Sequence, residues 1–532
     1  MDFKITQEAA LADHSHFEPQ PKAAFEDYLF YAQLQRREEE TASRISTSED
    51  EKTEQPVAHP PMTPEQTERA SASRALRLTS WISVFYLITT DILGPFNAPY
   101  AISQTGWIPG VLLYFFMGVA ATYSGLILWQ LFLKLDSVRY PLRTYPDIAG
   151  RIFGKAAQHI CTFLQSLQLL MNVAVICLSN GQSLAQVVQN RLCFSVCIVI
   201  FPIIGMMIGQ IRSLKNFSWL ANSAVWINLA IIFISMGFVA HSPPNFAAAA
   251  SSLGVEAGPV VTAKYVSLPL YNQINGVMQM VFAYGGAMIF PEIMAEMRRP
   301  MDFWKGFSIA QLLIFFAYLL YGCFIYAYQG QFTLPAAYQG VSTYSWQTVG
   351  NVLGIVTGLI AAGLYGNIGI KTVYINIVEE LFKGPRLMSS KGRTVWFILV
   401  LFYWSFAFVV GSAIPQLGNI VGLIGAVAIM QFTYTFPPLL WVGYEVIIDA
   451  MKEDGPYVPG SGANGRIDTW RDWSRWKRGL FTGRWHLKLF NVVIGLGGLA
   501  TACLGMWGSG EAIKAGFEFA GAATSFGCKA PV

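Results

Sequence analysis

Charged and helix-breaking residues interrupt the first long apolar segment of this chain, where both are costly in a lipid environment. The stretch TTDILGPFNAPY, residues 89–100, contains Asp91 together with Gly94, Pro95 and Asn97. The Asp91 carboxyl could carry a proton, pair with the ammonium group of a ligand, or cap the short helix that follows the break. The residues alone leave these three roles open.

A second apolar segment carries a matching break. The stretch VMQMVFAYGGAMIFPEIMAEM, residues 277–297, holds Gly285 and Gly286, with Pro291 five residues later. Glycine permits an unwound backbone and proline removes an amide donor, so freed N–H and C=O groups can face a polar ligand. A proline kink explains either break alone, but two breaks at corresponding positions predict a binding site near the membrane midplane.

The ends of such half-helices favour a zwitterion, because an N-terminus attracts a carboxylate and exposed carbonyls attract an ammonium group. In the third span, Gln168 and Asn172 share one helix face, either to bond a neighbouring helix or to line the pocket. Tyr284 is also a candidate gating aromatic. The predicted substrate-binding residues are Thr90, Asp91, Leu93, Gly94, Asn97, Gln168, Asn172, Phe282, Ala283, Tyr284, Gly285 and Gly286.

Two further ionisable groups, with Asp91, form the predicted proton or ion site. Lys371 lies in the apolar stretch YGNIGIKTVYIN, where we expect it either to contact the carbonyls of the first break or to extend to the headgroups. Glu292 follows the second break and shares a helix face with Glu296. This pair could form a proton path or an inner gate with Arg298 or Arg299, or simply a solvated helix end.

The composition is that of a polytopic membrane protein, since 53% of the 532 residues are apolar and 13% are charged. The basic residues form no stripe, which argues against a nucleic-acid partner. Eleven segments are long enough to cross a bilayer. They cover about 79–103, 107–133, 157–180, 192–210, 218–240, 271–297, 304–327, 346–378, 394–414, 417–445 and 489–510.

Loop charge orients these spans. With the N-terminus in the cytosol, cytosolic loops hold twenty-two Lys and Arg residues, and the opposite loops hold two, Arg191 and Lys264. The two broken segments are five spans apart, so spans one to five and six to ten run in opposite senses. The sequence therefore predicts an all-α fold with a five-plus-five inverted repeat and broken helices 1 and 6.

Three parts of the chain are expected. Residues 1–78 form a disordered cytosolic tail, with a short helix possible in FEDYLFYAQLQRREEE and possible contacts to regulatory proteins. Residues 79–510 form the membrane domain, in which the Trp-rich segment 446–488 is either an amphipathic stretch in the cytosolic headgroup layer or a solvated loop. Residues 511–532 form an extracytosolic tail.

Catalytic and metal-binding motifs are missing from the sequence. There is no HExxH, GxSxG, P-loop or paired His/Cys pattern, so we expect neither an enzyme nor a bound metal or cofactor. The cysteines show no metal-site spacing and are interpreted as small apolar packing residues. They are Cys161, Cys177, Cys193, Cys197, Cys323, Cys503 and Cys528.

An ordered set of motifs resembles the amino acid/auxin permease family, in particular its fungal neutral and aromatic amino-acid permease branch. The resemblance covers about residues 75–510. It rests on PYAISQTGW (99–107), YPDIAGRIFG (145–154), QIRSLKNFSWL (210–220), FAYGGAMIFPEIMAEM (282–297) and IVGLIGA (420–426). The family usually shows Gly-x-Gly at the first break, whereas this chain has Ile92 in place of the first glycine.

The resemblance implies an eleven-span, LeuT/APC-like permease that moves amino acids by alternating access, commonly with protons, and more often at the plasma membrane than at the vacuole. We therefore expect a secondary active transporter of neutral or aromatic amino acids. Two alternatives stay open: a receptor that keeps the transporter fold and senses amino acids, and a transporter of a cationic amine, which Asp91 would suit.

Overall fold

The computed structural model describes residues 24–47, 79–92, 96–211, 217–385, 387, 389–457, 465–518 and 523–531. These residues fold as helices, with isolated β-bridges between Thr79 and Met297 and between Pro244 and Val341. The all-α class predicted from the sequence is therefore confirmed for the described part of the chain.

Nine helical segments of this described part are long and apolar enough to cross a membrane, and each overlaps a predicted span. The shorter apolar helix α8 (Phe194–Ile208) and a divided first span occupy the other two predicted positions, so the count of eleven stays a prediction. The nine are Trp107–Leu135 (α5), Lys155–Val187 (α7), Asn222–Ala240 (in α9, Phe217–Ala240), Leu270–Ala295 (α11 and α12), Pro300–Phe332 (around α13, Phe303–Gln329), Tyr344–Glu379 (from α14, Tyr344–Val373), Ser390–Ala413 (α15), Leu417–Glu453 (α16 to α17) and Trp485–Glu518 (α19).

Both predicted breaks are present. The first span consists of α3 (Trp81–Ile92) and α4 (Ala98–Thr105), and Asn97 precedes α4 as its N-cap residue. Pro99 lies in the first turn of α4, where its missing amide donor costs nothing. The sixth span consists of α11 (Leu270–Ala283), a short 3-10 turn (Ala287–Ile289) and α12 (Phe290–Ala295).

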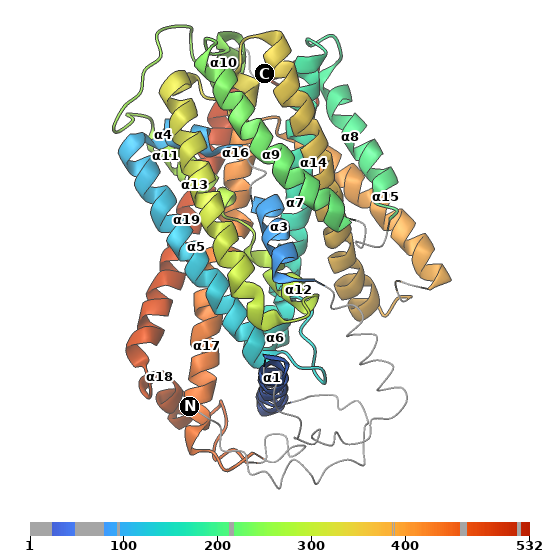
Figure 1. Cartoon of the computed structure of the whole chain (residues 1–532), viewed down its shortest axis with the longest axis vertical. Helices are drawn as coiled ribbons and strands as arrows, with labels where there is room; N and C mark the ends of the chain where they lie inside the picture. The colour runs from blue at the N-terminus through green and yellow to red at the C-terminus, as the bar shows by residue number, and fades with distance from the viewer. Residues whose placement is uncertain are drawn as a thin grey trace.

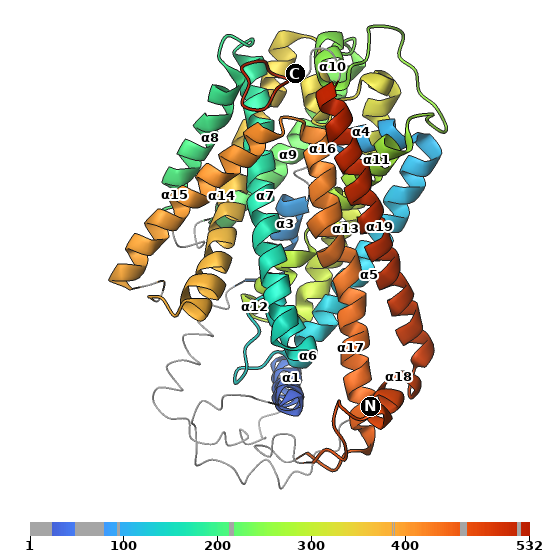
Figure 2. The same cartoon turned by 180° about the vertical axis from the view of Figure 1, so that it is seen from behind.

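Helix packing in the two halves follows one pattern (Figures 1 and 2). In the first half α3 packs on α9, and in the second α11 packs on α16 (Leu417–Ile424). The contact of α7 with α15 has its counterpart in α14 with α8, and that of α7 with α16 has its counterpart in α14 with α9. The first span lies on α13, as the sixth lies on α5. This correspondence is what a five-plus-five inverted repeat produces.

The tenth span contains a feature that the sequence did not predict. Between α16 and α17 (Phe436–Ala450) the helix widens into two π-helical segments, Gly425–Ile429 and Gln431–Thr435. Such segments often occur at functional sites.

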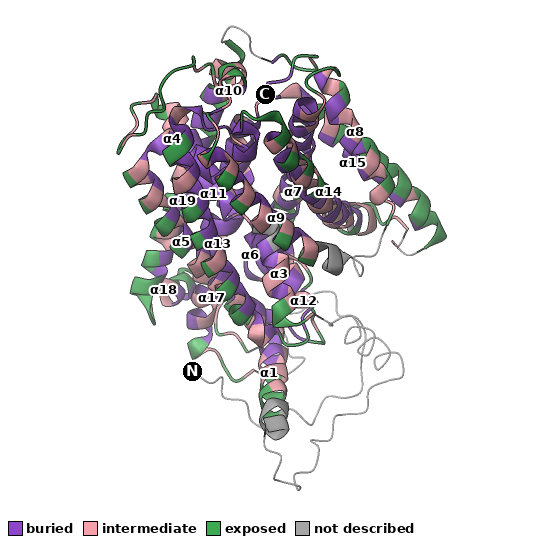
Figure 3. Cartoon of the chain, turned by 45° about the horizontal axis from the view of Figure 1, so that its top comes forward, coloured by how far each residue is buried: buried purple, intermediate pink, exposed green. Residues whose placement is uncertain are grey.

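Many large apolar side chains are exposed on the helices, as a lipid environment requires. Figure 3 shows buried residues gathered in the helices at the centre of the bundle and many exposed residues on the outlying helices α8 and α15, where Met207 and Phe402 are each 72% exposed. Small residues let the helices approach closely: a Cβ at Gly205 of α8 would lie 2.3 Å from the Trp404 ring of α15. The chain is a multi-pass integral membrane protein.

The helix α1 (Phe25–Thr47) lies at the end of the bundle predicted to face the cytosol, and it includes the apolar patch of the N-terminal segment (Figure 1). Phe25 and Leu29 are buried. At one end of α1, the Glu26 carboxylate accepts a 2.6 Å hydrogen bond from the Arg466 guanidinium. Farther along, Arg36 pairs with the buried Asp136 at 3.2 Å, after α5. These contacts fix α1 to two separate loops at this end of the bundle.

The Trp-rich segment forms α18 (Trp473–Phe481) at the same end. Its Trp473 and Trp476 are exposed, while Arg475 is fully buried between the carboxylates of Asp454 and Asp468. The Arg478 and Arg475 guanidinium groups hold the pKa of Asp468 well below its usual range. The helix therefore shows exposed aromatic rings on one side and a closed ionic network on the other.

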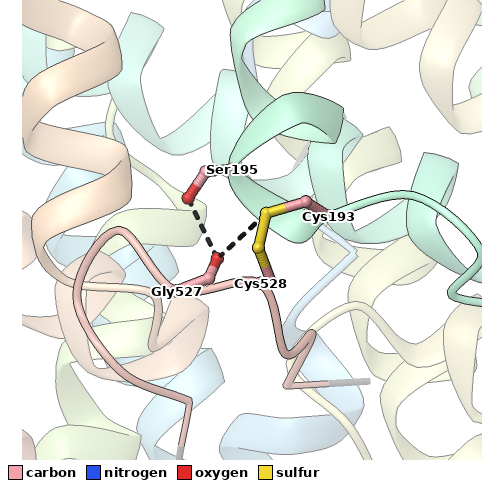
Figure 4. Close-up of a disulfide and its surroundings, with 4 residues drawn as sticks. All are labelled: Cys193, Ser195, Gly527 and Cys528. Carbon is pink, nitrogen blue, oxygen red and sulfur yellow. Dashed lines mark hydrogen bonds between the residues drawn. A yellow bond between two sulfur atoms is a disulfide. The ribbon is translucent and has the colours of Figure 1, made fainter.

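A disulfide joins Cys193 to Cys528 at the opposite end of the bundle, across 335 residues of sequence (Figure 4). Ser195 of α8 also donates a 3.0 Å hydrogen bond to the Gly527 carbonyl. The prediction that these two cysteines are packing residues is wrong. Spacing rules detect nearby cysteines, and this pair is brought together only by the fold.

Candidate functional site

A cavity of about 130 Å³ lies between the two broken spans and the central helices α7, α9 and α14. One wall comes from the breaks, through Phe96, Asn97, Gln279, Phe282 and Gly285. Another part of the wall comes from the central helices and includes Asn172, Asn180, Asn228 and Thr357. Apolar residues of α16 and of the first π-helical segment complete the lining, among them Leu417 and Ile429.

Four of the residues predicted from the sequence lie in this wall: Asn97, Asn172, Phe282 and Gly285. Among the other described residues of that prediction, Gln168, Ala283, Tyr284 and Gly286 lie outside the lining. The Tyr284 hydroxyl instead donates a 3.2 Å hydrogen bond to the Tyr114 carbonyl of α5. Leu93 and Gly94, and the side chains of Thr90 and Asp91, lie outside the described residues.

A side-chain bridge joins the two broken spans at the cavity. The Asn97 amide donates a 2.9 Å hydrogen bond to the Gln279 side-chain carbonyl on α11. Gln279 in turn donates to the Gly418 carbonyl of α16. One glutamine therefore holds three elements together, and sequence reasoning missed it because a lone glutamine in an apolar helix gives no signal of its partner.

The second break needs glycine for a steric reason. A Cβ on Gly285 would lie 2.7 Å from the Ile429 side chain and 2.9 Å from the Phe282 carbonyl oxygen. The break therefore packs directly against the π-helical part of the tenth span, which lines the same cavity.

A loop segment between α13 and α14 forms part of the cavity wall. The Phe96 ring makes an edge contact with the Tyr338 ring at 5.3 Å between centroids. Tyr338 belongs to the 3-10 turn Ala337–Gly340, which is fixed by a 3.0 Å hydrogen bond from Gln339 to Ser183 of α7. The absence of a Cβ at Gly354 of α14 leaves room for the Tyr338 hydroxyl, 2.8 Å from where that Cβ would lie. The turn with Tyr338 is therefore held in place as part of the cavity wall.

The described lining contains polar side chains but no Asp, Glu, Lys, Arg or His. Four of its buried amide side chains keep an atom without a hydrogen-bond partner among the described residues: Asn97 Oδ1, Asn172 Oδ1, Asn180 Nδ2 and Asn228 Oδ1. Unpaired buried polar atoms are costly, so they indicate a ligand that supplies the missing bonds. Asn180 and Asn228 were not predicted, although Asn172, Ser179 and Asn180 follow a helical spacing that could have indicated a polar stripe.

Glu292 lies below the cavity, where α12 meets α7 and α6 (Tyr145–Phe153). One carboxylate oxygen accepts hydrogen bonds from Gln165 at 2.7 Å and from the Tyr145 amide at 3.3 Å. The other oxygen has no partner among the described residues. Within the described chain no ion pair joins Glu292 to Arg298 or Arg299, so the predicted gate with these arginines is not formed here.

Lys371 lies near the end of α14, where its ammonium group interacts electrostatically with Glu296 at the end of α12. The carbonyls of the first break, its predicted partners, lie outside the described residues. Beside Glu296, Thr79 donates a 3.1 Å backbone hydrogen bond to the Glu296 carbonyl and accepts one from Arg298. The start of the first broken span and the end of the sixth are therefore attached to each other, at the end of the bundle predicted to face the cytosol.

The family model and the similar proteins named below agree on one family. The model of the family described as "Transmembrane amino acid transporter protein" matches residues 77–444. The chain is 23% identical over 371 residues to the "N amino acid transport system protein" of Neurospora crassa, covering 68% of this chain and 75% of that protein. It is 24% identical over 397 residues to the "Lysine histidine transporter-like 4" of Arabidopsis thaliana, covering 69% and 81%. Among solved structures, a mutant manganese transporter of Eremococcus coleocola matches with a TM-score of 0.41 and 10% identity, over 86% of this chain and 98% of that one.

Proposed function

This chain belongs to the transmembrane amino acid transporter family, and we propose that it moves a neutral amino acid across the membrane by alternating access, in symport with protons. The observation that carries the proposal is the uncharged, amide-lined cavity between two broken spans. A charged side chain in that cavity would lack a counter-ion among the described lining residues, and an unpaired buried charge is strongly disfavoured.

The helix ends at the cavity suit the common part of all amino acids. The N-terminus of α4 begins at Asn97, and the C-terminus of α11 ends beside Phe282 and Gly285, all three in the cavity wall. A helix N-terminus carries partial positive charge and a C-terminus partial negative charge. The substrate carboxylate therefore belongs at α4 and its ammonium group at the end of α11.

Two separate contacts can act as gates. The loop segment with Tyr338 forms part of the cavity wall, and the attachment of Thr79 to residues 296–298 joins the two broken spans. Alternating access requires these two contacts to open in turn, while one structural repeat rocks against the other around a fixed binding site.

Glu292 is our candidate for the coupling proton. It is a carboxyl group with one unpaired oxygen, placed where α12, α7 and α6 meet below the cavity. Protonation would turn the unpaired oxygen into a donor and change how α12 is held. Asp91 and Lys371 remain candidates from the sequence alone.

The disulfide supports an orientation. Disulfides persist in oxidising compartments, so the end that carries Cys193 and Cys528 belongs outside the cytosol and α1 belongs inside. The same orientation follows from loop charge. We place the protein in the plasma membrane, in agreement with the fungal permeases it resembles.

The deciding experiment is uptake of radiolabelled amino acids into proteoliposomes, with and without an inward proton gradient. Accumulation that requires the gradient supports the proposal. Binding without accumulation would favour the sensor alternative, and accumulation of a cationic amine in preference to neutral amino acids would favour the amine transporter.

A further inference from the structure

We propose that the wall formed by α7, α9 and α14 is a side-chain subsite for a carboxamide, so that the preferred substrates are asparagine and glutamine. This inference rests on the proposed function and narrows the substrate from neutral or aromatic amino acids to those with an amide side chain. It assigns Asn180 and Asn228 as the residues that determine specificity.

The two asparagines offer complementary unpaired atoms. Asn180 of α7 has an unpaired amide nitrogen, which is a donor, and Asn228 of α9 has an unpaired carbonyl oxygen, which is an acceptor. Each side chain is 2% exposed and lines the cavity. A substrate carboxamide matches both, since its oxygen accepts from Asn180 and its NH₂ group donates to Asn228.

The position of Asn180 is fixed by α14. A Cβ on Gly358 would lie 2.4 Å from the Asn180 side-chain oxygen, so the amide occupies the space that glycine leaves open. Thr357, the neighbouring polar residue of α14, directs its hydroxyl proton to the carbonyls of Leu353 and Gly354. Among the described amides of this wall, the unpaired donor is therefore Asn180 Nδ2, and the unpaired acceptors are Asn228 Oδ1 and Asn172 Oδ1.

The same cavity is lined by the helix ends that suit the substrate's carboxylate and ammonium groups. With those groups at α4 and α11, the substrate side chain points toward Asn180 and Asn228. The aromatic and aliphatic residues around it, such as Phe282 and Val421, contact the methylene groups of the side chain.

Selectivity follows from the cost of unpaired polar groups. Leucine has nearly the shape of asparagine but would leave Asn180 and Asn228 without partners when it enters. A site built to hydrogen-bond its substrate rejects an analogue that lacks the bonding group far more strongly than an apolar site rejects a polar isostere. We expect at least roughly tenfold preference for a carboxamide over leucine in kcat/KM.

The test measures uptake into proteoliposomes and ligand-induced thermal stabilisation of the purified protein, with asparagine, glutamine, leucine, phenylalanine and lysine. The wild type is expected to prefer the two carboxamides in both measurements. Asn180→Leu and Asn228→Leu, singly and together, are expected to reverse the order toward leucine. The matched control is Asn376→Leu, because the wild-type Asn376 amide donates a hydrogen bond to the Thr372 carbonyl outside the cavity. This variant is expected to keep the wild-type order of substrates.

Two results would separate the claims. Accumulation with leucine or phenylalanine ahead of both carboxamides would overturn the subsite and leave the proposed transport intact. A lack of accumulation with selective stabilisation by glutamine or asparagine would overturn transport and support the subsite. If the double variant does not fold, the wild-type order and the two single variants decide the question.

Discussion

Asn97 at the first break and Gln279 before the second are joined by a hydrogen bond of 2.9 Å, so a pair of side chains connects the two broken spans at the cavity wall. Gln279 also bonds the Gly418 carbonyl of α16. Movement of either half-helix during transport must therefore break or carry along this pair.

Gln279→Leu is expected to reduce uptake about tenfold or more, because it removes the bonds to both Asn97 and Gly418 while keeping a similar side-chain size. Initial uptake rates and surface expression measure the effect. Gln273→Leu is the control on the same helix, since Gln273 bonds loop carbonyls away from the cavity. Wild-type uptake by Gln279→Leu would show that the bridge has no role in transport.

Glu292→Gln is expected to abolish the pH dependence of uptake while substrate binding is retained. The wild type should take up substrate faster as the pH on the disulfide side falls, because protons then drive symport. Glutamine keeps the bond with Gln165 possible but cannot exchange a proton. Asp147 on α6 is the charged group that acts on Glu292, and it remains in the variant.

The comparison for this prediction is Glu296→Gln, since Glu296 lies exposed at the end of the same helix. This variant is expected to keep the pH profile of the wild type. An unchanged profile in Glu292→Gln would rule out Glu292 as the proton carrier and return attention to Asp91.

Cys193→Ser is expected to lower the thermal midpoint of the purified protein, with Cys528→Ser and the double variant showing the same loss. Removing a native cross-link between distant residues costs about 2–4 kcal/mol. Cys323→Ser, at a free cysteine, should have little effect. An impermeant maleimide should label Cys528 of the Cys193→Ser variant on intact cells, and labelling only after permeabilisation would contradict the proposed orientation.

Glu26→Arg is expected to detach the start of α1. In the wild type Glu26 Oε1 and Arg466 Nε form an ion pair at 2.6 Å, and the variant would place two positive charges there instead. Loss of a hydrogen-bonded charged pair costs about 1.5–3 kcal/mol. Limited proteolysis at the cytosolic face should then cut within α1 earlier. Adding Arg466→Glu should restore protection, whereas equal sensitivity of the single and double variants would show that the pair does not hold the helix.

The sequence predicts the breaks well because glycine and proline act locally. Gly285 follows the end of α11, and Pro99 and Pro291 lie in the first turns of α4 and α12. Asn97 and Phe282 were identified because they lie next to those breaks. The apolar spans were predicted for a similar reason, since their length reflects the membrane rather than the packing.

The part of the cavity wall formed by α7, α9 and α14 was harder to predict. Asn180 and Asn228 lie in unbroken apolar helices, where a polar side chain most often bonds a neighbouring helix. Both line the cavity because of the way α7 and α9 pack around α14, and this packing is a property of the whole bundle. The disulfide between Cys193 and Cys528 also depends on the packing of the whole bundle, because Cys193 follows α7 and Cys528 follows α19.

That bond also bears on how the molecule is made. Cys193 precedes α8, whereas Cys528 follows α19. In the proposed orientation the two thiols can meet only after α19 has crossed the bilayer, so an oxidised pair marks a chain in which α8 and α19 are both inserted. A mobility difference between oxidised and reduced chains on a non-reducing gel would therefore follow this step of biogenesis in the cell.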